Sequence, residues 1–203
     1  MTEIPCKGII LLHELENNNT KSWFSVHKAE IDQYVTDPSR EAGEELRELV
    51  ESLSGTPMTV KFFRMHRDIR FSADKSPYNP HVRFSIWPAS QTMCESVCFH
   101  FSIETLKLAL GVGVWEFKDR LTQFRSKCSE IEPLLLSGMR VSEPELKKVP
   151  KGFEPTQPWS DHYRRKGLTV WFDNEHTENQ ASSFNPDQVK LLLPVYKWLS
   201  ELA

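Results

Sequence analysis

The sequence has 203 residues, and its 25 Lys and Arg side chains against 28 Asp and Glu give a formal net charge of −3. This balance argues against a wholly basic nucleic-acid-binding protein. The 12 Phe, 6 Trp and 4 Tyr residues supply ample apolar surface for a core, which argues against intrinsic disorder. No apolar run approaches the roughly 18 residues of a membrane span, and the start Met1–Lys7 lacks the pattern of a secretory signal. We therefore expect a cytoplasmic protein without a membrane partner.

The first quarter of the chain has the spacing of helices. Residues 9–15 form an apolar cluster that ends at three asparagines, 17–19, which predicts a short helix and a turn. Thr20 is a suitable N-cap for a second helix. The pair Asp37-Pro38 predicts the start of a third helix, and Gly55 predicts its end.

The period then changes to that of β-strands. Strands are predicted over residues 58–65, 81–87, 95–103 and 108–115, because these stretches are rich in Val, Ile and Phe and alternate. The alternation is clearest in the third stretch, where Val97, Phe99, Phe101 and Ile103 form one set and Cys98, His100 and Ser102 the other. In the fourth stretch, Gly111 and Gly113 predict a bend or a close approach of the backbone.

The second half of the chain adds helices, a long connection and one more strand. A helix from Glu116 onward is predicted to pack on the sheet, and residues 139–159, with four prolines, are predicted to be a connection. Residues 168–172 are predicted to be the last strand. Asn185-Pro186-Asp187 predicts the start of a C-terminal helix, which Pro194 should kink or split. The predicted fold is a single α+β domain over residues 1–203, with a mainly antiparallel sheet packed against N-terminal, central and C-terminal helices.

The positive charge is concentrated in one part of the sequence. Residues 57–90 contain six basic and two acidic side chains, so this window carries +4 and the rest of the chain −7. Its centre, residues 64–78, is a connection of more than a dozen residues between two predicted strands. Long connections held by a sheet are often functional, so this segment is the first place to look for a site.

The same segment carries a resemblance to a known family. The pattern Arg67-Asp68-x-Arg70-Phe71-Ser72-x-Asp74-Lys75-x-Pro77-Tyr78, together with segments 17–24 and 146–153, resembles a widespread bacterial and fungal family of conserved proteins known only as a domain of unknown function. The resemblance covers about residues 9–200 in order and spacing. It implies a single-domain soluble protein and implies no activity. The chain departs from the pattern at Asn79, where Lys is more usual, and in strand 95–103, which lacks paired tyrosines.

The basic side chains of this segment have the chemistry of an anion site. Arg67, Arg70 and Lys75 can converge on a phosphate or a carboxylate, because guanidinium groups donate paired hydrogen bonds and Lys adds a point charge. Tyr78 can donate another hydrogen bond, and Lys151 can reach the group if its connection folds over the sheet. The leading hypothesis is therefore a site for an anionic small molecule, such as a phosphorylated metabolite or a nucleotide.

Two alternatives stay open. Asp68 and Asp74 are the candidate catalytic residues of a metal-dependent phosphoester hydrolase, although no metal-ligand spacing in the sequence supports a divalent cation and no cofactor is assigned. Acids that alternate with Arg also form salt bridges that only lock a loop, as in an interaction or scaffold protein. Whether the protein is an enzyme is left open. Nucleic acid is not expected as a partner, because the rest of the chain is acidic.

Overall fold

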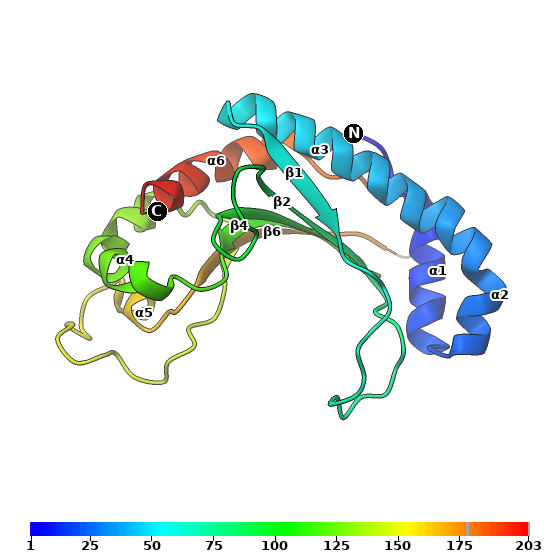
Figure 1. The fold of residues 1–203 in the computed structure, drawn as a ribbon, viewed down its shortest axis with the longest axis horizontal. Coiled ribbons are helices and arrows are strands. Elements are labelled where there is room, and N and C mark those ends of the chain that lie inside the picture. The colour runs from blue at the N-terminus through cyan, green and yellow to red at the C-terminus, as the bar shows by residue number, and fades with distance from the viewer. Residues whose placement is uncertain (178, 203) are drawn as a thin grey trace.

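A six-stranded antiparallel sheet runs through the molecule, with the strand order β1-β2-β3-β4-β6-β5 (Figure 1). The computed structural model describes residues 1–177 and 179–202. The strands are β1 (Met58–Phe62), β2 (Val82–Pro88), β3 (Cys98–Ile103), β4 (Lys107–Val114), β5 (Met139–Val141) and β6 (Leu168–Glu175). Each neighbouring pair is antiparallel, which confirms the predicted α+β class with a mainly antiparallel sheet.

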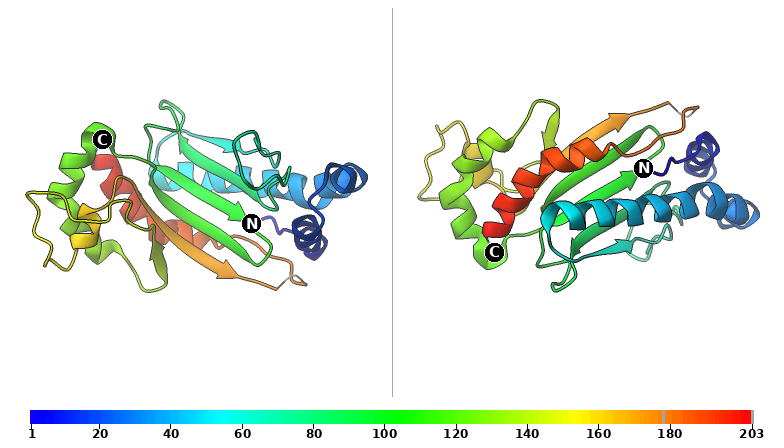
Figure 2. Two further views of the ribbon diagram at one scale, coloured as in Figure 1. Left: turned by 90° about the horizontal axis from the view of Figure 1, so that it is seen from below. Right: turned by 90° about the horizontal axis from the view of Figure 1, so that it is seen from above.

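Two long helices pack on one face of this sheet (Figure 2). Helix α3 (Asp37–Ser54) lies on β1 and β2, and helix α6 (Pro186–Glu201) lies on β4 and β6. Helices α1 (Cys6–Asn17) and α2 (Lys21–Ile31) lie beyond the end of the sheet, and the π-helical turn Asp32–Thr36 joins α2 to α3 (Figure 1). The face of the sheet opposite α3 and α6 is called the open face below.

The helix ends follow the capping residues that the sequence predicts. The Thr20 hydroxyl accepts the backbone N–H of Trp23 at 3.2 Å, and Gly55 ends α3 in the left-handed region at a φ of 70°. The Asn185 side chain likewise caps α6. Helix α6 runs on through Pro194, so the chain does not split there as the sequence suggested, because buried side chains on both sides of the proline hold the helix against the sheet.

The alternation along β3 divides its side chains between the two faces of the sheet. Val97, Phe99, Phe101 and Ile103 are at most 4% exposed and belong to the core under the helices. Phe99, for example, stacks on Tyr196 of α6 with ring centroids 5.1 Å apart. The other set, Cys98, His100 and Ser102, lines the open face. The predicted strand and its two-sided pattern are therefore confirmed.

Residues 116–138 and 142–167 form an end lobe at the side of the molecule away from α1 and α2 (Figure 1). It contains α4 (Leu121–Lys127), the flanking 3₁₀ turns and the short helix α5 (Ser160–Tyr163). The predicted central helix is present as α4, but its Phe124 packs beside Trp198 of α6, with ring centroids 6.1 Å apart, instead of across the sheet. The predicted connection 139–159 begins with the edge strand β5, which the sequence analysis missed. Among the described residues, no helix has both the length and the apolar character needed to cross a bilayer.

Candidate functional site

The basic segment predicted as a site forms an excursion, residues 63–81, between β1 and β2 (Figure 1). Its two sides are joined by backbone hydrogen bonds, from the Arg67 N–H to the Pro77 carbonyl at 2.9 Å and from the Asn79 N–H to the Met65 carbonyl at 2.7 Å. The Arg67 guanidinium forms an ion pair with Asp74 across the excursion. The segment is therefore a braced loop built from its own residues.

The three cations predicted to bind an anion have three different partners. Arg67 pairs with Asp74, whereas Arg70 grips both carboxylate oxygens of Asp68, with Nη2 to Oδ2 at 2.6 Å. The Lys75 ammonium donates to the Ile69 carbonyl at 3.0 Å. The structure thus brings these side chains into one loop but gives each a separate internal acceptor instead of a shared centre.

The two aspartates named as candidate catalytic residues are engaged in the same network. Asp74 accepts hydrogen bonds from the hydroxyl and the N–H of Ser76 and from Arg67, and these bonds hold its pKa well below the ordinary value. Hydrogen bonds from Arg70 likewise lower the pKa of Asp68. A carboxylate with so low a pKa is a weak general base at neutral pH. In the part of the chain that the structure describes, no three His, Cys, Asp or Glu side chains gather as a metal site requires.

Tyr78 and Lys151 occupy very different places. Tyr78 is 6% exposed and stacks on Phe24 of α2, with ring centroids 3.9 Å apart. Its backbone N–H and carbonyl both bond to the Asn19 side chain, so this residue anchors the excursion to the turn between α1 and α2. Lys151 is exposed. The end lobe, which contains it, lies at the opposite end of the sheet from the excursion (Figure 1).

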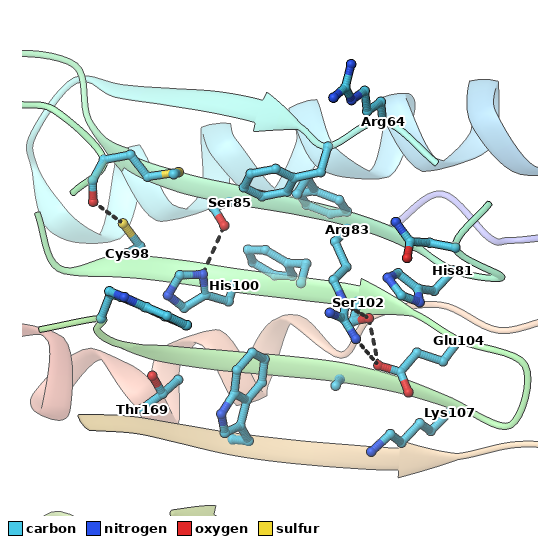
Figure 3. Close-up of a pocket in the computed structure, with 18 of the residues that line it drawn as sticks. Arg64, His81, Arg83, Ser85, Cys98, His100, Ser102, Glu104, Lys107 and Thr169 are labelled. Atoms are coloured by element: carbon cyan, nitrogen blue, oxygen red, sulfur yellow. Dashed lines mark hydrogen bonds and ion pairs between the residues drawn. The ribbon is translucent and has the colours of Figure 1, made fainter. Parts of the chain in front are cut away.

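The open face of the sheet carries a groove of about 910 Å³ (Figure 3). Its floor comes from β2, β3, β4 and β6, and the excursion adds Arg64 and His81 at one end. Pairing across the strands arranges the floor in rows. One row contains Arg83, Ser102, Ala109 and Asp173, and the next contains Ser85, His100, Gly111, Trp171 and Arg140. Because side chains on one face of a strand repeat every second residue, the two rows lie about 7 Å apart.

The first row and its neighbours make one end of the groove basic. Arg83 donates to the Ser102 hydroxyl at 3.1 Å and lies 3.4 Å from the Glu104 carboxylate. Figure 3 shows these side chains beside one another on the open face. The Lys107 ammonium lies 3.3 Å from the Asp173 carboxylate, which also forms an ion pair with Arg140. Two carboxylates therefore balance three cations within the floor.

Other side chains complete this basic end. Arg64 at the rim adds a fourth cation, for which the described residues provide no ion pair. Burial and the nearby Arg83 lower the pKa of His81 to about 4, so this imidazole is uncharged at neutral pH. The basic end thus keeps a surplus of positive charge at neutral pH without any contribution from histidine.

The second row forms a polar and aromatic centre. The His100 Nδ1 is 2.9 Å from the Ser85 hydroxyl, and burial lowers the pKa of His100 to about 4. Trp171 lies beside this imidazole, with ring centroids 5.8 Å apart. At the far end, burial raises the pKa of the Cys98 thiol to about 12, so it stays protonated and is a weak nucleophile. These groups suit binding and orientation of a ligand.

The groove was not predicted from the sequence. Two signals in the sequence point to it: Arg83 belongs to the basic window, and the alternation places His100 and Ser102 on one side of a strand. Their proximity to Lys107, Trp171 and Arg140 depends on the strand order and the register.

The chain matches the DUF2461 family of conserved hypothetical proteins over residues 9–198 and belongs to that family. This match confirms the resemblance noted in the sequence. Comparison with curated proteins gives no match. The family's description names no activity, so the function has to be argued from the groove.

Proposed function

We propose that this protein binds a small anionic ligand in the groove on the open face. The observation that carries the proposal is the basic end, where Arg64, Arg83 and Lys107 lie around a groove with few carboxylates. Guanidinium and ammonium groups bind phosphate and carboxylate through charge-assisted hydrogen bonds. The groove has the volume of a site for a metabolite-sized molecule. Phosphorylated metabolites and nucleotides are the ligands that this chemistry fits.

The residues chosen from the sequence enter this proposal as positioning residues. The ion pair of Arg67 with Asp74, and the anchoring of Tyr78 on Phe24, fix the excursion that carries Arg64 and His81 to the rim. Arg70 and Lys75 brace the same loop through their internal partners. Lys151 receives no role, because it lies at the other end of the sheet.

The interaction or scaffold alternative also has an observation in its favour. The Arg67–Asp74 and Arg70–Asp68 pairs satisfy one another, as they would in a loop that is only structural. The two functions differ in what they require of Arg83, a groove residue that the excursion does not need for its own bracing. Ligand binding depends on it, and scaffolding by the excursion does not.

Arg83→Gln is the test of the proposal. Wild-type protein is screened by thermal shift with inorganic phosphate, sugar phosphates and nucleotides, because a ligand at about 100 times its Kd adds roughly 2.7 kcal/mol of stability. For any probe that shifts the melting temperature, we expect Arg83→Gln to weaken binding about tenfold, as removal of a charged hydrogen-bond donor does. Arg40→Gln is the matched control, since Arg40 is an exposed residue of α3 on the other side of the sheet.

The result against the proposal is equally definite. If no probe stabilises the wild-type protein, or if Arg83→Gln and Arg40→Gln bind the probe as tightly as wild type, the groove is not an anion site. The scaffold function is then the better account of the chain.

A further inference from the structure

The indole of Trp171 lies flat against β4, where residue 111 has no side chain. A Cβ atom at Gly111 would come within 2.5 Å of two indole carbons, so the ring occupies the space that a side chain would fill. One face of the indole therefore packs on the backbone of β4. Trp171 also lines the groove, so the part of the ring that is not against β4 borders the cavity.

Two neighbours hold this ring in place. The His100 imidazole lies 5.8 Å from the indole centroid at an angle of 32°, and it is itself fixed by Ser85. The Arg140 guanidinium lies over the same ring, 5.6 Å from its centroid, and its ion pair with Asp173 keeps it there. The indole is thus an ordered flat surface, and an ordered surface binds a second ring at a low entropic cost.

The register relates this flat surface to the basic end. Trp171 and Asp173 are two residues apart on β6, and Asp173 contacts Lys107. A ring that stacks on Trp171 would therefore have Arg140 beside it in the same row and the Lys107 ammonium about one row away, or about 7 Å along the strands. A planar base joined to a phosphate through a sugar spans a distance of this order.

We infer that the groove selects an anion that carries a planar aromatic ring, as a nucleoside monophosphate does, with the ring stacked on Trp171 and the phosphate at Arg83 and Lys107. This inference rests on the proposed function, because it assumes that the basic end binds the anionic group. Beyond the proposed function, the inference specifies that the ligand contains an aromatic ring and that Trp171 binds this ring. Aromatic side chains stack on bases of any sequence, so the indole selects for a ring and leaves the choice among bases to other contacts.

The test compares two probes that share a phosphate and a sugar. AMP carries a base and ribose 5-phosphate does not, and both are titrated into the full chain by calorimetry, with tryptophan fluorescence as a second signal. We expect AMP to bind about tenfold more tightly than ribose 5-phosphate, the usual effect of one stacked base. Phenyl phosphate, a simpler ring with a phosphate, should also bind more tightly than inorganic phosphate.

Variants assign the preference to the ring. Trp171→Leu should remove the preference for AMP over ribose 5-phosphate, whereas Trp171→Phe should retain part of it. Trp87→Leu is the control, because Trp87 lies on β2 outside the groove lining and bonds to Gln91. The comparison of the two probes on wild-type protein needs no variant, so it holds even if Trp171→Leu fails to fold.

Different results would overturn the stacking inference and the proposed anion site. Equal affinity of wild-type protein for AMP and ribose 5-phosphate, or an AMP preference that survives in Trp171→Leu, overturns the stacking inference and leaves the anion site standing. No binding of either probe overturns the proposed function, and the stacking inference with it.

Discussion

His100 sits in the middle of the groove floor as an uncharged ring. Its Nδ1 is held by the Ser85 hydroxyl, and burial lowers its pKa from the ordinary 6.5 to about 4. Because this imidazole next to the indole of Trp171 is uncharged, it adds no positive charge to the centre of the groove. Its protonation state therefore contributes to the difference between the basic end and the aromatic centre.

The pKa of His100 predicts how stability changes with pH. As pH falls through 6.5, His100 becomes protonated in the unfolded chain, whereas in the folded protein it becomes protonated only near pH 4. Stability should therefore be full above pH 6.5 and be lost as pH falls toward 4. Urea unfolding at pH 7 and at pH 5 measures this loss, and His100→Gln should make it smaller. The same loss in His100→Gln as in wild type would contradict the assignment.

Gly111 and Gly113 show how far single residues can be understood from the sequence. Their presence in a strand predicted a bend or a close approach of the backbone, and the structure confirms the close approach. A Cβ at Gly113 would lie 2.1 Å from the Leu168 carbonyl oxygen on the neighbouring strand. Which groups come close was beyond the sequence, because β6 is more than fifty residues further along the chain.

The excursion between β1 and β2 is the element that links the residues chosen from the sequence to the groove. Its hydrogen bonds run across the loop, and its ion pairs lie within it, so it presents Arg64 and His81 as part of one braced unit. A loop of this length without internal bonds would hold its side chains less firmly, and the rim of the groove would be less ordered.

Arg67→Ala tests the bracing of the excursion. Loss of the pair with Asp74 should speed hydrogen exchange at the amides of Arg67 and Asn79, which bond across the loop, and lower the melting temperature. It should also weaken binding of a groove ligand, though by less than Arg83→Gln does. Arg40→Ala is the control, because Arg40 lies on α3, outside the excursion, and its side chain is 64% exposed. Lower stability with unchanged affinity would instead support the scaffold function.

Elements that are determined by local signals could be predicted from the sequence, whereas those that depend on long-range strand pairing could not. Thr20, Gly55 and Asn185 mark helix ends by chemistry that acts within a few residues, so the sequence placed them well. The three-residue strand β5 exists through its pairing with β6, which no local pattern reveals. The groove could not be predicted for the same reason. The positive charge of the excursion is visible in the sequence, but the ion pairs within it are not.

The whole molecule separates charge between its two sides. The face of the sheet covered by α3 carries the acidic residues Glu41, Glu44, Glu45, Glu48 and Glu51 of that helix, and the open face carries the basic end of the groove. A small anion is therefore repelled from one side and attracted to the other. This asymmetry explains how a chain with a net charge of −3 can offer an anion site.

The most direct measurement is a titration of isotope-labelled protein with AMP, followed by backbone amide NMR shifts. The groove account expects the largest shifts on the open face, at Arg83, Ser102 and Lys107 and at the indole N–H of Trp171, with the helices α3 and α6 little changed. Shifts confined to the excursion around Arg67 and Lys75 would move the site to the loop and contradict the groove account. If AMP, inorganic phosphate and ribose 5-phosphate all leave the spectrum unchanged, ligand binding in the groove is contradicted altogether.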